Sequence, residues 1–254
     1  MWGLYDDLIA AVPDNLQVQD CLAGLNWFLV KSIGVGVAMR PPERAGSIRN
    51  AGHLRGMKLR DLSAWAKSWD EYEAAMGVAA INSALNAPEI VGQRFGRQLS
   101  ESNNQDVFTY LREQMRGKKV AVVGHFDGLE RVAKICDLSV LERRPQDGDL
   151  PDVACEYILQ DREIVIMTAT TLINKTMPRL LALSQGARIV VAGPTTPLHP
   201  LTFNYGIELL GGLVLDDEQS AWRIVAEGGQ KQLLSAGSRM LNLESPRVTG
   251  TPMP

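Results

Sequence analysis

The 254-residue sequence is poor in the side chains that build disulfide frameworks and soft-metal centres. It has three cysteines, Cys21, Cys136 and Cys155, and three histidines, all widely separated. An odd number of thiols without a C-x-x-C pair argues against a disulfide framework and against a structural zinc site. A metal centre built by this chain alone would have to use oxygen ligands together with histidine.

The sequence also lacks a run of basic residues and a long apolar stretch. Its net charge is −3 and its pI is about 5.7, so neither nucleic acid nor a membrane is expected as a partner. No apolar stretch approaches the roughly 18 residues that span a bilayer. The opening "MWGLYDDLIAAVP" has two aspartates and no basic leader, and it predicts an amphipathic helix rather than a signal peptide. We expect a cytoplasmic protein.

The first hundred residues predict a small α+β unit, because helical spacing alternates there with short, partly alternating apolar segments. Asp70 followed by Glu73 predicts a capping box at the start of an alanine-rich helix. The predicted elements, in chain order, are a helix over 2–12, antiparallel strands within 15–40, a loop over 41–57, helices over 59–68 and 70–86, a linker over 87–102 and a helix over 104–116.

From residue 118 onward, continuous apolar runs alternate with helical segments, which predicts a parallel sheet covered on both faces. The predicted strands lie in 118–124, 138–143, 163–169, 187–193 and 212–216, followed by closing helices over 219–229 and 231–241. We therefore expect an α/β protein with two domains. A small α+β domain covers residues 1–100, and a Rossmann-like domain with a mostly parallel sheet covers residues 101–254.

A ligand site is expected at the carboxyl ends of the parallel strands, where loops diverge and helix N-termini point inward. The loop "VVGHFDG" places Gly124, His125 and Gly128 there. It lacks two glycines of the G-x-G-x-x-G fingerprint, so a dinucleotide is poorly supported. The alternative is that the two glycines serve a tight turn and close packing, and that His125 caps or packs.

Glu142 ends the second predicted strand, 18 positions after Gly124. An acidic residue about 20 positions after the glycine loop binds a ribose in nucleotide-binding folds. The alternative is a salt bridge with Arg143 or Arg144. Further on, Asp149 precedes Pro151, a pattern that predicts a helix cap and first turn.

The stretch "TATTLINKT", residues 168–176, carries more polar groups than a helix cap uses. Thr176 is predicted to cap the helix that begins at "MPRLLALSQ". The surplus groups could cradle an anion or another polar ligand, although a self-bonded turn is the alternative. These surplus residues are Thr168, Thr170, Thr171, Asn174 and Lys175.

Two more segments complete the predicted site. The proline-rich loop "AGPTTPLHP" offers the hydroxyls of Thr195 and Thr196, with His199 further along, unless it is only a rigid turn. Asn82 lies inside a helix although asparagine is a poor helix former, so it needs a partner. That partner is either a ligand in a crevice between the domains or an interhelical group.

Taken together, "GVAAINSALN", "VVGHF", "LERRPQDGDLPD", "TATTLINKT", "GPTTPL" and "GIELLGG" resemble a bacterial and archaeal family of unknown function. Its members are described as "putative heavy-metal chelation" proteins. The resemblance runs in order across most of the chain. It implies an enolase N-terminal-like domain, a Rossmann-like domain and a site between them. That site carries over onto Asn82, Glu142, Thr170, Asn174 and Thr195.

The leading hypothesis is a metal-handling protein that binds a small anionic ligand or a metal chelate in the interdomain crevice. A divalent or transition metal ion held by the protein itself would use Glu142 with His125 or His199, whereas a chelator could instead bring its metal already bound. The alternative is a Rossmann-type enzyme that uses S-adenosylmethionine or a nucleotide, with Glu142 on the ribose.

Whether the chain catalyses a reaction is left open by the sequence. It contains no H-E-x-x-H and no G-x-S-x-G motif, and His125 is conceivable as a base without any spacing that demands it. A homodimer is expected, since symmetric dimers are the commonest oligomers.

Overall fold

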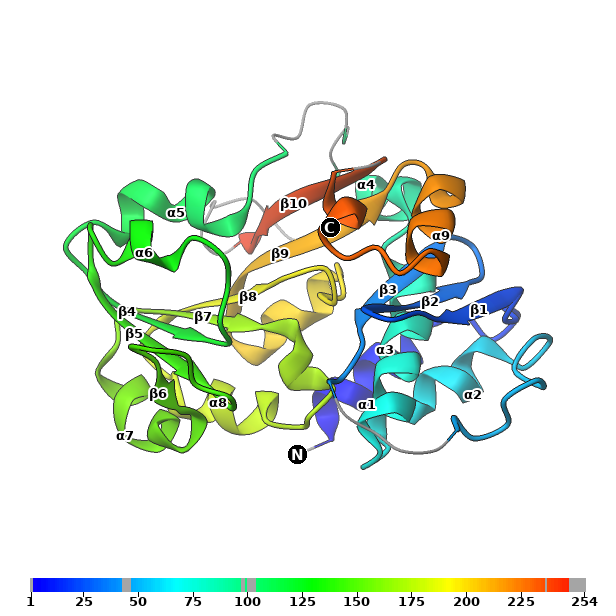
Figure 1. Cartoon of the computed structure of the whole chain (residues 1–254), viewed down its shortest axis with the longest axis horizontal. Helices are drawn as coiled ribbons and strands as arrows, with labels where there is room; N and C mark the ends of the chain where they lie inside the picture. Colours follow the sequence, from blue (N-terminus) through cyan, green and yellow to red (C-terminus); the bar gives the residue numbers. More distant parts are fainter. Residues whose placement is uncertain (1, 43–46, 97–98, 100–103, 236, 247–254) are drawn as a thin grey trace.

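A computed structural model describes residues 2–42, 47–96, 99, 104–235 and 237–246 of the chain. It contains a three-stranded antiparallel sheet and a seven-stranded, mostly parallel sheet, with helices packed around both (Figure 1). The small sheet is formed before residue 100 and the large sheet after it. The α/β class predicted from the sequence is confirmed.

The small sheet has the order β1-β2-β3 and confirms the strands expected within 15–40. Both of its faces are covered, because β2 and β3 are buried along nearly their whole length. The elements of this part are α1 (Gly3–Ala10), β1 (Asp20–Ala23), β2 (Trp27–Lys31), β3 (Val35–Met39), α2 (Leu59–Ser63), η1 (Ala64–Lys67) and α3 (Glu71–Leu85).

Helix α3 is the central element of this part, and every residue from Ala74 to Leu85 is buried. Asp70 caps it as predicted, accepting hydrogen bonds from the N–H groups of Tyr72 and Glu73. The reciprocal half of the predicted capping box is absent. The N–H of Asp70 donates to Ser68 Oγ, and Glu73 accepts from that same hydroxyl.

The linker predicted over 87–102 is wrong in its first half. Residues 88–95 form helix α4 (Pro88–Phe95), which begins with proline and ends at Gly96 in the left-handed conformation, with φ 59°. A proline in the first turn and a glycine just past the end are both favourable for a short helix. Residues 97–98 and 100–102 of the predicted linker lie outside the described residues.

The large sheet has the strand order β10-β9-β8-β7-β4-β5-β6, and only β10 runs antiparallel to its neighbour. The order reverses at β4, which pairs with β5 on one side and with β7 on the other. The strands are β4 (Lys119–Val123), β5 (Asp137–Glu142), β6 (Leu150–Pro151), β7 (Ile164–Thr168), β8 (Arg188–Ala192), β9 (Ile207–Leu215) and β10 (Ser238–Glu244).

Two predictions in this part are wrong. The closing helix expected over 231–241 is a short turn, η7 (Lys231–Leu234), followed by strand β10. Strand β9 is longer than expected and is buried almost throughout, so it offers β10 a continuous pairing edge. The helix expected after Asp149 begins later, at Asp152, because Leu150–Pro151 pairs with β5 as strand β6.

The remaining helices flank the large sheet. They are α5 (Val107–Met115), α6 (Leu129–Val132), η3 (Asp152–Ala154), α7 (Cys155–Ile158), η4 (Leu159–Asp161), η5 (Ala169–Leu172), α8 (Met177–Leu183), η6 (Pro200–Tyr205) and α9 (Glu218–Ala226). Of these, α9 packs against β1 and β2 of the small sheet, as Figure 1 shows.

Two apolar cores contain residues from both sides of the boundary near residue 100. One core joins Met76 and Ile81 of α3 to Met167 of β7. A second joins Trp27 and its neighbours in the small sheet to residues of β9 and α9. Whether residues 1–100 and 101–254 fold as separate domains stays a prediction.

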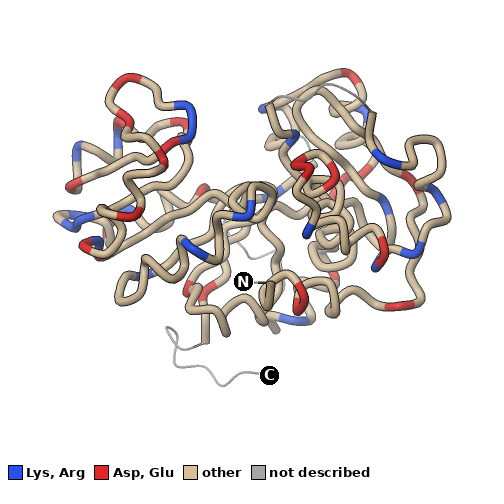
Figure 2. The backbone as a smooth tube through the Cα atoms, turned by 90° about the horizontal axis from the view of Figure 1, so that it is seen from below, with Lys and Arg blue, Asp and Glu red and all other residues tan. Residues whose placement is uncertain are grey.

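Charged residues of both signs are spread over the whole fold (Figure 2). In the part of the chain that the structure describes, no helix is long and apolar enough to cross a membrane.

The contact between β3 and α3 is so close that adding one methyl group at Gly36 is predicted to destabilise the fold. A Cβ at Gly36 would lie 2.0 Å from the carbonyl oxygen of Ala79 and 2.1 Å from the nitrogen of Ser83. Both atoms belong to the helix backbone and cannot swing aside. Gly36→Ala should therefore lower the free energy of unfolding by about 3 kcal/mol, the upper end of the usual cost of overpacking. Urea denaturation followed by circular dichroism measures this loss.

Gly211→Ala is the matched control, because its added Cβ would meet nothing closer than 3.4 Å. This glycine is also buried in a strand, and its substitution should change stability by less than about 1 kcal/mol. Equal losses in the two variants would contradict the close contact between β3 and α3.

Candidate functional site

A cavity of about 850 Å³ opens at the carboxyl ends of the parallel strands. Its floor is formed by the residues that follow β4, β5, β7 and β8, on both sides of the position where the strand order reverses. This is the place where open parallel sheets bind ligands. The opposite wall comes from residues 39–42 after β3 and from Glu71 at the start of α3, and Gln230 and Lys231 close the rim.

Seven of the residues predicted for the site line this cavity. They are Gly124, His125, Glu142, Thr168, Thr170, Asn174 and Thr195. The structure places Asn82, Thr171, Lys175, Thr196 and His199 elsewhere.

Gly124 brings the loop after β4 against the end of β7. Its φ is 101°, and an added Cβ would lie 2.7 Å from Cγ2 of Thr168. Both the backbone conformation and the space therefore require glycine at this position. The next residue, His125, is fixed through its backbone N–H, which donates to Oε2 of Glu142 at 2.9 Å.

Glu142 uses both carboxylate oxygens on the backbone. Besides the bond to the N–H of His125, its Oε1 accepts from the N–H of Arg144 at 3.1 Å. Glu142 thus shapes the corner between β4 and β5 while it faces the cavity.

The hydroxyl-rich loop after β7 is partly self-bonded. Thr171 is buried and donates its hydroxyl to the carbonyl of Thr168 at 2.6 Å. The hydroxyls of Thr168 and Thr170 lie 3.1 Å apart, and both of these residues line the cavity. The expected surplus of polar groups is therefore reduced to these two hydroxyls and the amide of Asn174.

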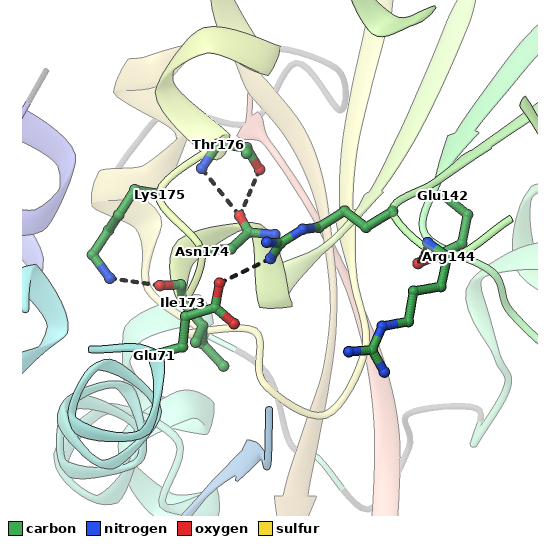
Figure 3. A network of polar contacts seen from close by, with 8 residues as sticks. Glu71, Glu142, Arg144, Ile173, Asn174, Lys175 and Thr176 are labelled. Carbon is green, nitrogen blue, oxygen red and sulfur yellow. Dashed lines mark hydrogen bonds and ion pairs between the residues drawn. The ribbon is translucent and has the colours of Figure 1, made fainter. Parts of the chain in front are cut away.

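Asn174 and its neighbours form the end of this loop (Figure 3). Oδ1 of Asn174 accepts from both the N–H and the hydroxyl of Thr176, at 3.1 and 2.7 Å. This orientation leaves the Nδ2 donor of Asn174 for the cavity. The predicted cap is wrong, because the Thr176 side chain donates to Asn174 instead of accepting from the N–H groups of α8.

Lys175 has a strained backbone and is half-buried. Its φ is 67°, in the left-handed region that side chains other than glycine rarely adopt, and its Nζ donates to the carbonyl of Ile173 at 2.5 Å (Figure 3). Burial lowers the pKa of Lys175 from 10.5 to about 8, and the Glu71 carboxylate opposes this shift. Lys175 lies behind the loop and is not part of the cavity lining.

The cavity contains four cationic side chains, Arg40, Arg143, Arg144 and Lys231. Arg143 pairs with Glu71 at 2.8 Å and so connects the β5–β6 loop to the start of α3. This hydrogen-bonded pair raises the pKa of Arg143. Lys231 pairs in the same way with Asp127 at the rim.

Asn82 is a structural residue rather than a ligand group. It is fully buried, and its Nδ2 donates to the carbonyls of Val37 and Thr195, both at 2.9 Å. Asn86, one turn later, donates to the carbonyl of Thr196 and accepts from the N–H of Leu198. The two asparagines therefore satisfy the backbone of the loop after β8, which has no strand partner there.

The threonines of that loop are also engaged. Thr195 Oγ1 accepts from the N–H of Met39 at 2.9 Å, and Thr196 donates its hydroxyl to the carbonyl of Gly211 at 3.0 Å. Thr196 is completely buried, whereas Thr195 reaches the cavity wall. Sequence patterns alone cannot distinguish a threonine that faces a ligand from one that binds a neighbouring strand.

His199 does not reach the cavity, because it begins the turn η6. Its Nδ1 accepts from the N–H of Leu201 at 3.1 Å. The metal set expected from His125, Glu142 and His199 is therefore not assembled. In the described part of the chain, no three His, Cys, Asp or Glu side chains are grouped so that they could hold a metal ion, and the cysteines do not line the cavity.

The three arginines of the cavity were missed as site residues by the sequence interpretation. Arg143 and Arg144 lie in a quoted motif but were considered only as salt-bridge partners of Glu142. Arg40 follows a strand of the small sheet and reaches the cavity only through the tertiary fold. Its position after β3 offers no local sequence signal.

Comparisons with known proteins agree with this architecture. Residues 106–243 match the model of the DUF364 family and residues 5–85 match a second family model, and both models are described as "Putative heavy-metal chelation". An uncharacterised protein of Methanocaldococcus jannaschii is 28% identical over an alignment of 253 positions, and the match covers 94% of each chain.

Two solved structures of DUF364 proteins of unknown function are similar over nearly their whole length. The protein from Desulfitobacterium hafniense is 35% identical, with a TM-score of 0.88, and the match covers 96% of this chain and 99% of the other. The protein from Pyrococcus horikoshii is 23% identical, with a TM-score of 0.76 and coverage of 95% and 98%, and it supports the fold alone.

The environment of His199 predicts a pH dependence of stability. Burial, assisted by Arg94, lowers the pKa of His199 from 6.5 to about 4. The unfolded chain therefore binds a proton at His199 that the folded chain does not between these two pH values. Its contribution to stability is complete above pH 6.5 and is lost as the pH falls toward 4. Because the ring is partly exposed, we expect a loss of roughly 1 to 2 kcal/mol.

His199→Asn tests this prediction, since asparagine can still accept from the N–H of Leu201 but does not titrate. Urea unfolding at pH 7 and pH 4.5 should show a smaller loss of stability in the variant than in the wild type. Parallel losses in the two proteins would assign the acid sensitivity to other groups.

Proposed function

The chain belongs to the DUF364 family, described as "Putative heavy-metal chelation", and we propose that its cavity binds a small anionic molecule that itself holds a metal ion. In this proposal the metal is cargo and the protein recognises the organic part that surrounds it. The single observation that supports it most is the combination of a polar cavity containing several arginines with the lack of a grouped set of metal ligands in the described residues.

The size and position of the cavity suit a small molecule. A volume of about 850 Å³ lies within the 300–1,000 Å³ range that is typical of small-molecule sites. The floor lies at the reversal of strand order, where loops of neighbouring strands diverge. Trp27 and Phe126 contribute apolar surface to the same walls, so the site offers packing as well as polar contacts.

The cavity has four cationic side chains and three carboxylates, those of Glu71, Asp127 and Glu142, so the cations are in excess by one. Guanidinium groups recognise carboxylates and phosphates through paired N–H donors, and Arg40, Arg143 and Arg144 supply three of them. The hydroxyls of Thr168 and Thr170 and the amide of Asn174 add uncharged donors at the end of β7. A chelator with several carboxylates presents the complementary acceptors.

A bare metal ion is a poorer match to these residues. Structural metal sites place three or four protein ligands around the ion, with thiolate or imidazole ligands for heavy metals. The described residues contain no such group, and both carboxylate oxygens of Glu142 already accept backbone N–H groups. A preformed chelate satisfies the metal without requiring these ligands from the protein.

Isothermal titration calorimetry of metal-free protein tests this function. Iron(III) citrate or nickel citrate should bind with measurable heat, whereas the metal ion alone should not. Arg144→Gln should weaken binding of the chelate about tenfold, because a charge-assisted hydrogen bond is worth about 1.5 kcal/mol or more. Arg116→Gln, directly after α5 and outside the cavity, is the matched control and should leave the affinity unchanged.

Two results would contradict the proposal. Binding of the free metal ion with the same affinity as its chelate would point to a protein-built metal site. Equal loss of affinity in the Arg144 and Arg116 variants would assign the effect to net charge rather than to the cavity.

A second candidate function, use of an adenosine-containing cofactor such as S-adenosylmethionine, rests on the position of Glu142. This carboxylate lies at the end of the strand next to β4, where nucleotide-binding folds place the ribose partner. In a thermal-shift screen, a compound at 100 times its dissociation constant would stabilise the fold by about 2.7 kcal/mol. Glu142→Gln should abolish that shift and Glu130→Gln, on exposed α6, should not. Failure of every adenosine compound would reject this candidate.

A further inference from the structure

The binding function leaves one polar pair of the cavity unexplained. Nδ1 of His125 lies 2.9 Å from Oδ2 of Asp149, and His125 lines the cavity. The imidazole side chain is 31% exposed, whereas the Asp149 carboxylate is only 4% exposed. An imidazole at a cavity wall with a buried carboxylate behind it is an arrangement that orients histidine for proton transfer.

The carboxylate of Asp149 is held in place by its own turn. The N–H of Asp149 donates to the carbonyl of Gln146, and the N–H of Gln146 donates back to Oδ2 of Asp149, both at 3.0 Å. Gly148, with φ 89°, supplies the left-handed residue of that turn. A carboxylate this deeply buried requires such partners, and the imidazole is the remaining one.

The hydrogen bond to Asp149 determines which imidazole nitrogen is basic. A carboxylate accepts and does not donate, so Nδ1 carries the proton and donates it to the hydrogen bond. In the neutral ring, Nε2 then has the free lone pair. The backbone N–H of His125 is fixed by Glu142, so the ring cannot exchange its two nitrogens without breaking the pair.

Several carboxylates lie close to His125. Asp149 contacts the ring, Glu142 accepts from its backbone, and Asp127 lies two residues further along the same loop. Arg144, whose N–H bonds Glu142, is the cation nearest in the hydrogen-bond network. The buried carboxylate of Asp149 is the direct counterion.

The residues opposite His125 could stabilise a negative oxygen. Thr168 and Thr170 follow β7, the strand adjacent to β4, and Gly124 nearly touches Thr168. Their hydroxyls and the Nδ2 donor of Asn174 face the same cavity. No serine or cysteine is among the cavity residues described, and the hydroxyls of Thr168 and Thr170 lie 3.1 Å from each other, so we assign the proton that His125 accepts to the bound molecule.

We infer that His125 acts as a general base on an anionic oxo acid bound in the cavity, with Asp149 as the positioning residue. Nε2 takes a proton from the carbon next to the carbonyl, and the electron pair of that C–H bond moves into an enolate. The enolate oxygen accepts from the hydroxyl and amide donors after β7, and the arginines hold the carboxylate. Return of the proton from the imidazolium to the same carbon completes the cycle, so no further reactant is needed. This inference rests on the proposed function, because the oxo acid occupies the same cavity.

The first test needs no ligand and uses the three histidines of the chain. Nitrogen-15 NMR of the imidazoles should show His125 as the Nδ1–H tautomer. His199 is an internal reference that should show the other tautomer, Nε2–H. Its Nδ1 accepts from the N–H of Leu201 and must be unprotonated. Asp149→Asn should convert His125 to a mixture of tautomers. A wild-type His125 in the Nε2–H form would overturn the inference.

The second test measures the chemistry with 2-oxoglutarate in D2O. Wild-type protein should accelerate exchange of the C3 protons for deuterium by at least about 100-fold, the lower range for general base catalysis. His125→Gln should return exchange to background. Asp149→Asn should reduce it at least about tenfold and change its pH profile. His53→Gln, in an exposed loop, is the matched control and should exchange like the wild type.

Calorimetry with 2-oxoglutarate on each variant shows whether a loss of exchange comes from the missing base or from weaker binding of 2-oxoglutarate. Acceleration that survives in His125→Gln, or bound 2-oxoglutarate without acceleration in the wild type, would overturn the inference. Failure of the wild type to bind 2-oxoglutarate would also overturn it, because the substrate class would be wrong. The proposed function is tested separately, by the titration with metal citrates. The inference about His125 can therefore fail while the proposed function stands.

Discussion

The shape of the cavity depends on the hydrogen bonds that connect helix α3 to the loop that follows β8. Asn82 and Asn86 lie one turn apart on a helix with no exposed residue between Ala74 and Leu85, and their side chains satisfy backbone groups of residues 195–198. The approach of β3 to α3 at Gly36 fixes the other side of the helix. Because buried backbone groups must be paired, this loop cannot move away from α3 without leaving several of them unsatisfied. The two walls of the cavity are thereby held at a constant separation.

In this arrangement, only a few polar groups remain available to bind a ligand. Thr171 and Thr196 bind backbone carbonyls, the Thr195 hydroxyl binds Met39, and Oδ1 of Asn174 binds Thr176. Several threonines of the two loops therefore stabilise the fold by binding backbone groups. The cavity is lined by a smaller set of donors at and after the end of β7, three arginines, three carboxylates and one oriented imidazole. This composition suits an anionic organic molecule more than a naked cation.

The family description and the local chemistry are compatible when the metal is treated as cargo. Molecules that chelate metals are rich in carboxylate and carbonyl oxygens, and these are the groups that arginine, hydroxyl and amide donors recognise. The same groups acidify a neighbouring C–H bond, which is where a base such as His125 acts. Binding and proton transfer would thus use different atoms of one molecule in one cavity.

The sequence by itself determined the features that depend on short-range patterns. Apolar runs separated by helical segments predicted the parallel strands, Asp70 predicted the start of α3, and the residues after strand ends located Gly124, Glu142, Thr170 and Asn174 at a common site. The tertiary structure decided the rest. Residues 238–244 became a strand because β9 offered a pairing edge. Asp149 became a partner of His125, and His199 began a turn far from both, because contacts between segments distant in the chain outweigh local preference. A side chain's role is set by the backbone group or cavity that the fold brings to it, and one residue's neighbours along the chain do not contain that information.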